Sequence, residues 1–154
     1  YSSLKGSPYV PTKSKVMTAI LDAAKLKKGM KMLELGCGDG RVLIQAVRDY
    51  GVVGYGVDIN PIVLQQARWG ARGLSRERIK FENKNLHDIN VGTYDVVYLF
   101  LLPELLAKFA PKWEREAKKK TLFISHAFII KRWRKFLEKH VPGTQYDTYY
   151  YRIK

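Results

Sequence analysis

The sequence has 154 residues, the size of one domain, and 46% of them are hydrophobic, so one sizeable core is feasible. Its single cysteine rules out an internal disulfide and fits a reducing, intracellular setting, and no apolar run reaches the roughly 18 to 20 residues that span a bilayer. The 28 Lys and Arg against 14 Asp and Glu give a net charge of +14, which either attracts phosphate-rich polymers and acidic surfaces or only makes the surface soluble.

A polar arm precedes alternating helices and strands. Residues 1–12, YSSLKGSPYVPT, contain turn-forming Gly and Pro and predict an N-terminal arm, followed by a single domain at 13–154. Apolar residues at helical spacing, short apolar runs and the helix-starting pair Asn60 and Pro61 predict the elements that follow. In chain order these are a helix at 13–26, a strand at 31–35, a helix at 41–50, a strand at 52–58, a helix at 61–72, strands at 79–83 and 94–100, a helix at 103–117, and strands at 121–128 and 146–154.

Two segments are ambiguous. Pro111 should kink or divide the helix at 103–117, because proline removes a backbone donor. Residues 129–141 fit either an amphipathic helix or an edge strand. Strands alternating with helices imply right-handed crossovers and a mostly parallel, doubly wound α/β sheet, whose ligands bind at the carboxyl ends of the strands.

The turn ELGCGDG, from Glu34 to Gly40, lies at such a strand end. A turn without a ligand is one interpretation, but alternating glycines weaken a turn unless a backbone must approach another group. A dinucleotide is a second interpretation, and it requires G-x-G-x-x-G with a small third residue. Here the glycines are spaced G-x-G-x-G and the third fingerprint position is the large Arg41, so the pattern disfavours NAD and FAD.

The third interpretation is S-adenosylmethionine, whose methionine portion needs close backbone approach and whose ribose needs an acid. Asp58, in GVDIN, ends the second strand and could accept from both ribose hydroxyls; alternatively, it only caps a helix or stabilises a turn. LELGCGDG and GVDIN, in this order, resemble the first and acidic motifs of class I S-adenosylmethionine-dependent methyltransferases. The resemblance implies a Rossmann-like, doubly wound, mostly parallel seven-stranded sheet with an antiparallel last strand.

The same resemblance assigns roles to individual residues. Glu34 and the turn backbone would hold the methionine portion, and Asp58 the ribose. Asn85 and Leu86, in KNLHD, match the adenine position, where Asn85 departs from the usual Asp but keeps an acceptor oxygen. Phe100, which ends the fourth strand, would lie near the transferable methyl group. The expected cofactor contacts are Tyr9, Thr12, Glu34, Gly36, Gly38, Gly40, Asp58, Asn85, Leu86 and Phe100.

Methyltransferases for several other acceptors have characteristic sequence motifs, and this sequence lacks those motifs. The fourth strand ends in YLFLLP, without the D/N-P-P-Y/F/W of adenine amino-methyltransferases. Cys37, inside the glycine turn, is badly placed for cytosine C5 methylation, and no ribose-methylase set of catalytic residues is recognisable.

The N-terminal arm gives a more specific indication of the methyl acceptor. SPYVPT, LELGCGDGRV, YLFLLP and the end SHAF…YYYRIK together resemble a small family of protein lysine methyltransferases. That family includes archaeal broad-specificity enzymes and mitochondrial enzymes acting on the adenine nucleotide translocase and the ATP synthase c subunit. The resemblance implies that Tyr9, Pro11 and Thr12 fold over the cofactor; alternatively, Thr12 only caps the following helix.

The transfer of a methyl group to lysine suits an apolar site. Only the neutral amine attacks, and an aromatic channel favours sulfonium and methylammonium groups. Tyr9 and Phe100 are the expected channel residues, with Phe128 a further aromatic candidate. No dedicated general base is evident, since His126 and Tyr98 are weak options, and no metal site is expected.

The sequence therefore predicts a cytoplasmic protein-lysine N-methyltransferase of broad specificity, monomeric and not membrane-bound, that uses S-adenosylmethionine to modify proteins with accessible lysines. An RNA or small-molecule methyltransferase is the alternative within the enzyme class. A nucleic-acid-binding module without transfer activity is the alternative outside it. The charge further predicts weak, non-specific nucleic-acid binding.

Overall fold

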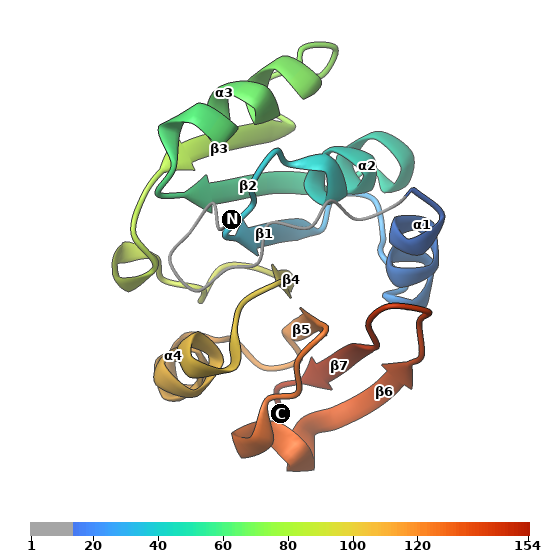
Figure 1. The fold of residues 1–154 in the computed structure, drawn as a ribbon, viewed down its shortest axis with the longest axis vertical. Helices are drawn as coiled ribbons and strands as arrows, with labels where there is room; N and C mark the ends of the chain where they lie inside the picture. The colour runs from blue at the N-terminus through green and yellow to red at the C-terminus, as the bar shows by residue number, and fades with distance from the viewer. Residues whose placement is uncertain (1–13) are drawn as a thin grey trace.

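Short apolar strands form the centre of the computed structural model, which describes residues 14–154 (Figure 1). The strands are β1 Lys31–Leu35, β2 Val53–Asp58, β3 Ile79–Asn83, β4 Val96–Leu99, β5 Leu122–His126, β6 Leu137–Val141 and β7 Thr148–Arg152. The α-helices are α1 Ser14–Ala23, α2 Arg41–Tyr50, α3 Pro61–Gly70 and α4 Pro103–Glu116, and two 3₁₀ helices are η1 Leu86–Asp88 and η2 Lys131–Phe136.

The strand order is β3-β2-β1-β4-β5-β7-β6. The first five strands in this order are parallel, and β7 runs antiparallel between β5 and β6. The chain order reverses between β1 and β4, which is where ligands of doubly wound sheets bind. The predicted fold class, a seven-stranded and mostly parallel sheet with an antiparallel last strand, is confirmed.

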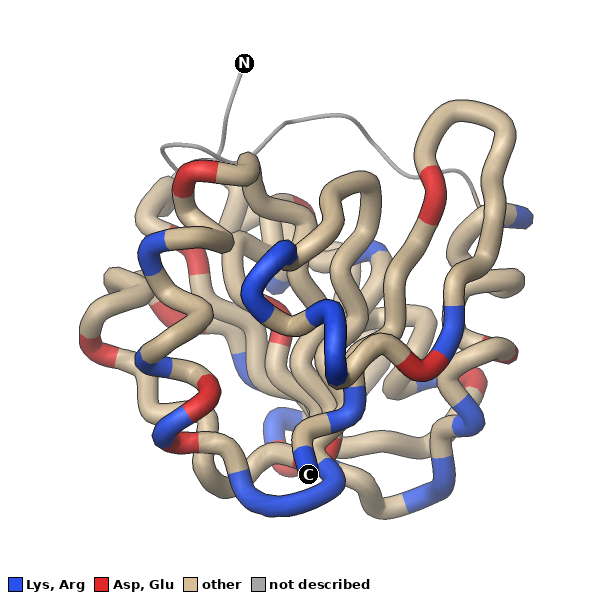
Figure 2. Tube along the Cα trace, turned by 90° about the horizontal axis from the view of Figure 1, so that it is seen from below, with Lys and Arg blue, Asp and Glu red and all other residues tan. Residues whose placement is uncertain are grey.

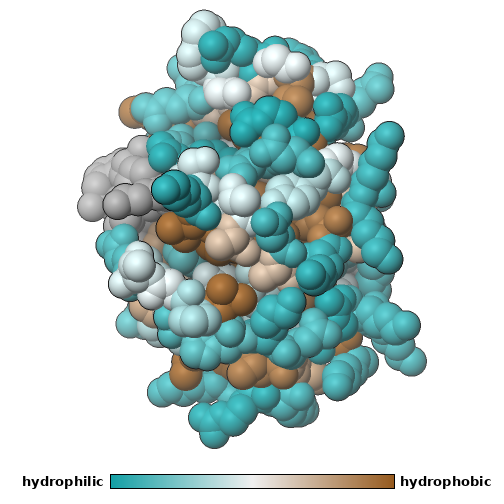
Figure 3. Space-filling view, turned by 90° about the vertical axis from the view of Figure 1, so that its right-hand side faces the viewer, coloured by the Kyte–Doolittle hydropathy of each residue, from teal (hydrophilic) through white to brown (hydrophobic). Residues whose placement is uncertain are grey.

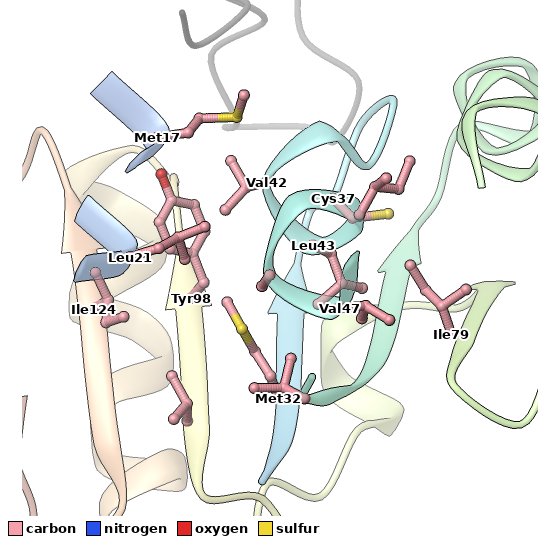
Figure 4. Packing of buried hydrophobic residues seen from close by; sticks show 14 of the residues in the cluster. Met17, Leu21, Met32, Cys37, Val42, Leu43, Val47, Ile79, Tyr98 and Ile124 are labelled. Atoms are coloured by element: carbon pink, nitrogen blue, oxygen red, sulfur yellow. The ribbon is translucent and has the colours of Figure 1, made fainter. Parts of the chain in front are cut away.

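Alternating residues of each strand feed two separate cores. On one face, Met32 and Tyr98 pack with α1, α2 and α3 (Figure 4), and we call this the first core. On the other face, Leu33 and Val97 pack with α4, η1 and η2, and we call this the second core. The strands are buried on both sides because the sheet lies between two helical layers.

Both ambiguous segments are now defined. Pro111 does not divide α4, which runs without interruption from Pro103 to Glu116. The buried side chains Phe109 and Trp113, on either side of the proline, hold both halves against the sheet. The segment 129–141 is neither alternative alone: it forms η2 and then the edge strand β6.

Charged residues cover much of the outside. Figure 3 shows hydrophilic residues over most of one face with small apolar patches between them, and Figure 2 shows Lys and Arg gathered around the C-terminus. Within residues 14–154, no helix combines the length and the apolar character that a membrane-spanning helix needs.

Candidate active site

The glycine turn joins β1 to α2 at the carboxyl end of the sheet. Gly36, Gly38 and Gly40 all have left-handed backbone, with φ of 72°, 56° and 75°, which side chains disfavour. The N–H groups of Gly36 and Cys37 both donate to the Val57 carbonyl, at 2.9 and 3.0 Å. The turn is therefore tied to the end of β2 and presents bare backbone to the end of the sheet.

Gly40 is also required for packing. A Cβ atom there would lie 2.7 Å from Cζ of Phe81 and 3.1 Å from Cβ of Ala67, well inside contact distance. The third glycine therefore lets α2 begin close to α3 and β3. The sequence comparison with G-x-G-x-x-G gave this packing role to the Arg41 position, whereas the structure assigns it to Gly40.

Asp58 fastens the turn to β2. One of its carboxylate oxygens accepts from the Gly38 N–H at 2.9 Å, and the other accepts from the Asn60 N–H at 2.9 Å. The side chain is fully buried. The turn-forming role considered for Asp58 is therefore real. The predicted ribose contact is compatible with it, because each carboxylate oxygen can accept more than one hydrogen bond.

Glu34 is the unusual charge of the site. It is 5% exposed, and among the described residues its Oε1 has no hydrogen-bond partner. Burial, together with the negative charges of Asp39 and Asp58, raises the pKa of the Glu34 carboxyl well above its usual range. A buried acceptor without a partner costs stability, so its presence beside the turn indicates a group that a cationic ligand would satisfy.

The segment after β3 lies against Asp58. The Asn83 side-chain amide and the Lys84 N–H both donate to the Asp58 carbonyl, at 3.1 and 3.2 Å. Asn85 and Leu86 therefore follow directly after the residues bonded to Asp58, and their adenine contact stays a prediction. The Asn85 oxygen caps η1 by accepting from the His87 N–H at 3.0 Å, and the Leu86 side chain is buried in the second core. Leu86 thus offers a ligand its backbone rather than its side chain.

Three aromatic rings meet where β4 and β5 end. Phe100 follows β4, and its ring centroid lies 4.9 Å from that of His126 and 5.7 Å from that of Tyr146, both edge-to-face. The His126 and Tyr146 rings are 5.6 Å apart. We call Phe100, His126 and Tyr146 the aromatic trio. It is on the opposite side of β1 from Asp58, since β4 and β5 follow β1 in the sheet.

His126 and the neighbouring Tyr98 are both uncharged near pH 7. Nδ1 of His126 is 2.9 Å from Oγ1 of Thr148, and burial lowers the pKa of His126 to about 4, so its ring is neutral near pH 7. Tyr98 lies one residue before the end of β4, and Figure 4 shows its hydroxyl directed toward the Met17 end of the first core. Burial raises the pKa of that hydroxyl well above its usual range, so it remains protonated.

The remaining candidates divide clearly. Tyr9, Pro11 and Thr12 lie outside the described residues. Phe128 packs against the second core and is not part of the trio. Burial raises the pKa of the Cys37 thiol, which keeps it protonated and agrees with its exclusion as a nucleophile. The sequence analysis did not predict Tyr146 as a site residue. In the sequence it marks only the start of a strand, and its partners His126 and Phe100 are 20 and 46 residues away.

A glycine turn after β1, an acid ending β2 and an antiparallel β7 inserted beside β5 define a class I S-adenosylmethionine-dependent methyltransferase. The family model of the ANTKMT methyltransferase domain matches residues 34–136, which include the turn, Asp58 and Phe100. The chain belongs to this family of methyltransferases.

Individual relatives agree on the class. The chain is 35% identical over 132 residues to the protein-lysine N-methyltransferase of Saccharolobus islandicus, covering 82% of this chain and 80% of that protein. It is 27% identical to the human lysine N-methyltransferase of the ATP synthase c subunit, covering 92% of this chain but 59% of the human protein. A crystal structure described as an RNA methyltransferase from Salinibacter ruber, with S-adenosyl-L-homocysteine, superposes with a TM-score of 0.87 at 29% identity and covers 94% of both chains.

The described residues fit S-adenosylmethionine. The unpartnered Glu34 oxygen suits an ammonium group, the glycine turn bares its backbone, and the Asp58 carboxylate lies at the end of β2. When bound, the cofactor supplies a methyl group activated by a positively charged sulfur. The aromatic faces of the trio are the protein groups suited to lie near such a charge.

Proposed function

We propose that the protein is a protein-lysine N-methyltransferase whose acceptor lysine enters through the aromatic trio. The observation that carries this proposal is the convergence of Phe100, His126 and Tyr146 at the ends of β4 and β5. Its support from relatives is the pair of curated lysine methyltransferases that match most of this chain. Within the site, the trio excludes water around the amine and orients it toward the cofactor.

The protonation of the trio suits an amine that arrives neutral. A lysine ammonium has a pKa of about 10.4, whereas that of His126 is about 4, so passing a proton between them would cost roughly 9 kcal/mol. His126 is therefore a positioning ring rather than a base. The amine loses its proton to water before it docks, and desolvation between aromatic faces keeps it neutral.

This protonation scheme predicts a simple pH profile. The value of kcat/KM for a peptide lysine should rise nearly tenfold per pH unit from about 7 to 9, because the neutral fraction of the amine rises so. A plateau beginning near pH 7 would reveal a base on the protein and contradict the scheme.

Two alanine variants distinguish the role of the aromatic trio from that of a neighbouring tyrosine outside it. Tyr146→Ala should lower kcat/KM for lysine roughly 3- to 30-fold, the range expected from losing one aromatic face beside a cationic group, and leave cofactor affinity unchanged. Tyr149→Ala is the matched control, since Tyr149 is also half-buried but stacks on His140 at 4.9 Å, away from the trio. Equal losses in both variants would remove Tyr146 from the acceptor site.

RNA is the second candidate acceptor, because the Salinibacter ruber structure that matches the whole fold is described as an RNA methyltransferase. The decisive experiment incubates the enzyme and labelled S-adenosylmethionine with a cell extract and divides the product between protease and nuclease. Label lost only to protease supports lysine methylation. Label lost only to nuclease would replace it with RNA methylation.

A further inference from the structure

A basic groove follows the outer edge of β3, at the end of the sheet that Figure 1 shows beneath α3. It has a volume of about 810 Å³. Its cationic lining consists of three arginines and two lysines, which are Arg68, Arg72, Arg76, Lys80 and Lys84. We call this cavity the β3 groove.

The single acid in the lining is Glu82, and its negative charge is balanced by Lys80. Glu82 accepts from the Tyr55 hydroxyl, and its Oε2 is 3.3 Å from Nζ of Lys80. Tyr55 and Lys80 thereby keep the pKa of the Glu82 carboxyl below its usual range. The groove therefore presents a net positive field to whatever enters it.

The outer backbone edge of β3 is already partly bonded within the protein. The bonds of β3 to β2 involve Arg78 and Lys84, so the residues between them at odd positions direct their N–H and C=O groups outward. Two of these outward groups are occupied: the Ile79 N–H donates to the Ser75 carbonyl, and the Phe81 carbonyl accepts from Arg68 at 2.9 Å. An added strand would therefore find two of the six outward groups already bonded, which weakens the docking of an acidic peptide by strand addition.

An exposed indole lies beside the groove. Trp69 is 68% exposed, whereas Trp113 and Trp133 are fully buried. Cζ of Arg72, which lines the groove, is 4.1 Å from the centroid of the Trp69 ring. The arginine thus links the cationic channel to an aromatic face, which is the combination that binds single-stranded nucleic acid without sequence preference.

We propose that the β3 groove binds single-stranded nucleic acid, with phosphates along its arginines and lysines and a base stacked on Trp69. The proposal does not depend on the identity of the methyl acceptor. β3 is four positions from β5 in the sheet, about 19 Å at the usual strand spacing, so the bound strand lies on the cofactor side and away from the aromatic trio. The groove would hold the enzyme near proteins that are themselves bound to nucleic acid.

The test uses Trp69 fluorescence, because the other two tryptophans are shielded from solvent. A short single-stranded uridine oligomer should quench the exposed indole on binding, and the binding constant should fall with salt with a logarithmic slope no steeper than about −3.5, or −0.7 for each of five contacts. Polyglutamate of matched length tests the rival partner. Salt-sensitive binding of polyglutamate with no quenching or binding by the oligomer would overturn the proposal in favour of an acidic protein.

Variants locate the site. Arg76→Ala with Lys80→Ala should reduce the salt slope by about 1.4 and weaken oligomer binding about tenfold or more between 50 and 200 mM salt. The control, Lys27→Ala with Lys119→Ala, removes the same charge from exposed lysines of a second basic pocket beside the amino ends of β4 and β5. This control should change the affinity by less than about twofold. Equal losses in the two double variants would show diffuse attraction and overturn the proposal.

Stacking has its own control. Trp69→Ala should weaken oligomer binding about fivefold or more, whereas Trp69→Phe should retain most of the affinity because it keeps an aromatic face. Neither change should alter the methylation of a free peptide. Unchanged affinity in Trp69→Ala would remove the stacking half of the proposal and leave no basis for preferring nucleic acid.

Discussion

Removing the Asp58 carboxylate tests the hydrogen bonds that connect the glycine turn to the end of β2. Asp58→Ala deletes the acceptor of two backbone N–H groups, those of Gly38 and Asn60, each at 2.9 Å. Hydrogen bonds to a charged group contribute about 1.5 to 3 kcal/mol each. Because water can enter and satisfy part of the loss, we expect the free energy of unfolding to fall by about 3 kcal/mol. For a domain of this size the melting temperature should drop by roughly 6 to 12 °C.

Cofactor affinity should fall as well, for two separable reasons. Loss of the predicted ribose contact alone should weaken binding by roughly 1.5 to 3 kcal/mol, and a loosened turn adds to this. Asp58→Asn is the matched control, because its side-chain oxygen can still accept from one N–H and from a hydroxyl. We expect its melting temperature and affinity to lie between those of the parent and Asp58→Ala.

The assay pairs thermal unfolding with calorimetric titration of S-adenosylhomocysteine. An Asp58→Ala protein that melts within a degree of the parent would refute the structural role of these hydrogen bonds. Unchanged affinity for S-adenosylhomocysteine would refute the ribose assignment. A loss of affinity without a loss of stability would leave the ribose assignment standing alone.

Three further predictions concern other buried groups. Since burial raises the pKa of Glu34, its ionisation destabilises the fold as the pH rises above about 4.5, so Glu34→Gln should increase the free energy of unfolding at pH 7 in urea titrations while weakening S-adenosylhomocysteine binding. Gly40→Ala should destabilise by about 2 kcal/mol or more through its clash with Phe81 and its positive φ, whereas Gly73→Ala, with open space around it, should be nearly neutral in the same measurement. The pKa of His126 falls from 6.5 unfolded to about 4 folded, so stability should decline by up to about 3 kcal/mol as the pH falls from 6.5 to 4, and His126→Gln should lack that decline.

Local patterns predicted most of the fold. The strand at 79–83 has the same bounds in the structure, because an apolar run between polar residues defines it, and Pro61 with Asn60 correctly predicted the start of α3. The turn from Glu34 to Gly40 was recognisable because its spacing is local. Division of the helix at Pro111 was the alternative that proved wrong, because it depends on packing that a local rule does not include.

Contacts between distant residues could not be predicted in the same way. The aromatic trio requires the register of β7 against β5, which pairs His126 with Thr148 and brings Tyr146 alongside. The β3 groove combines charges from α3, the following turn and β3, which look like ordinary surface residues when they are read along the chain. The hydrogen bond from Gly38 to Asp58 spans 20 residues and became evident only in three dimensions.

The position of β7 divides the enzyme into two parts that can vary separately. Glu34, the glycine turn and Asp58, which are assigned to the methionine portion and the ribose, all lie on β1, β2 or the turn between β1 and α2. Tyr146, on the proposed acceptor side, lies instead in the segment between β5 and β7, residues 127–147. Under the proposed function, substitutions around Tyr146 would therefore alter which lysines are accepted without touching the residues of the glycine turn.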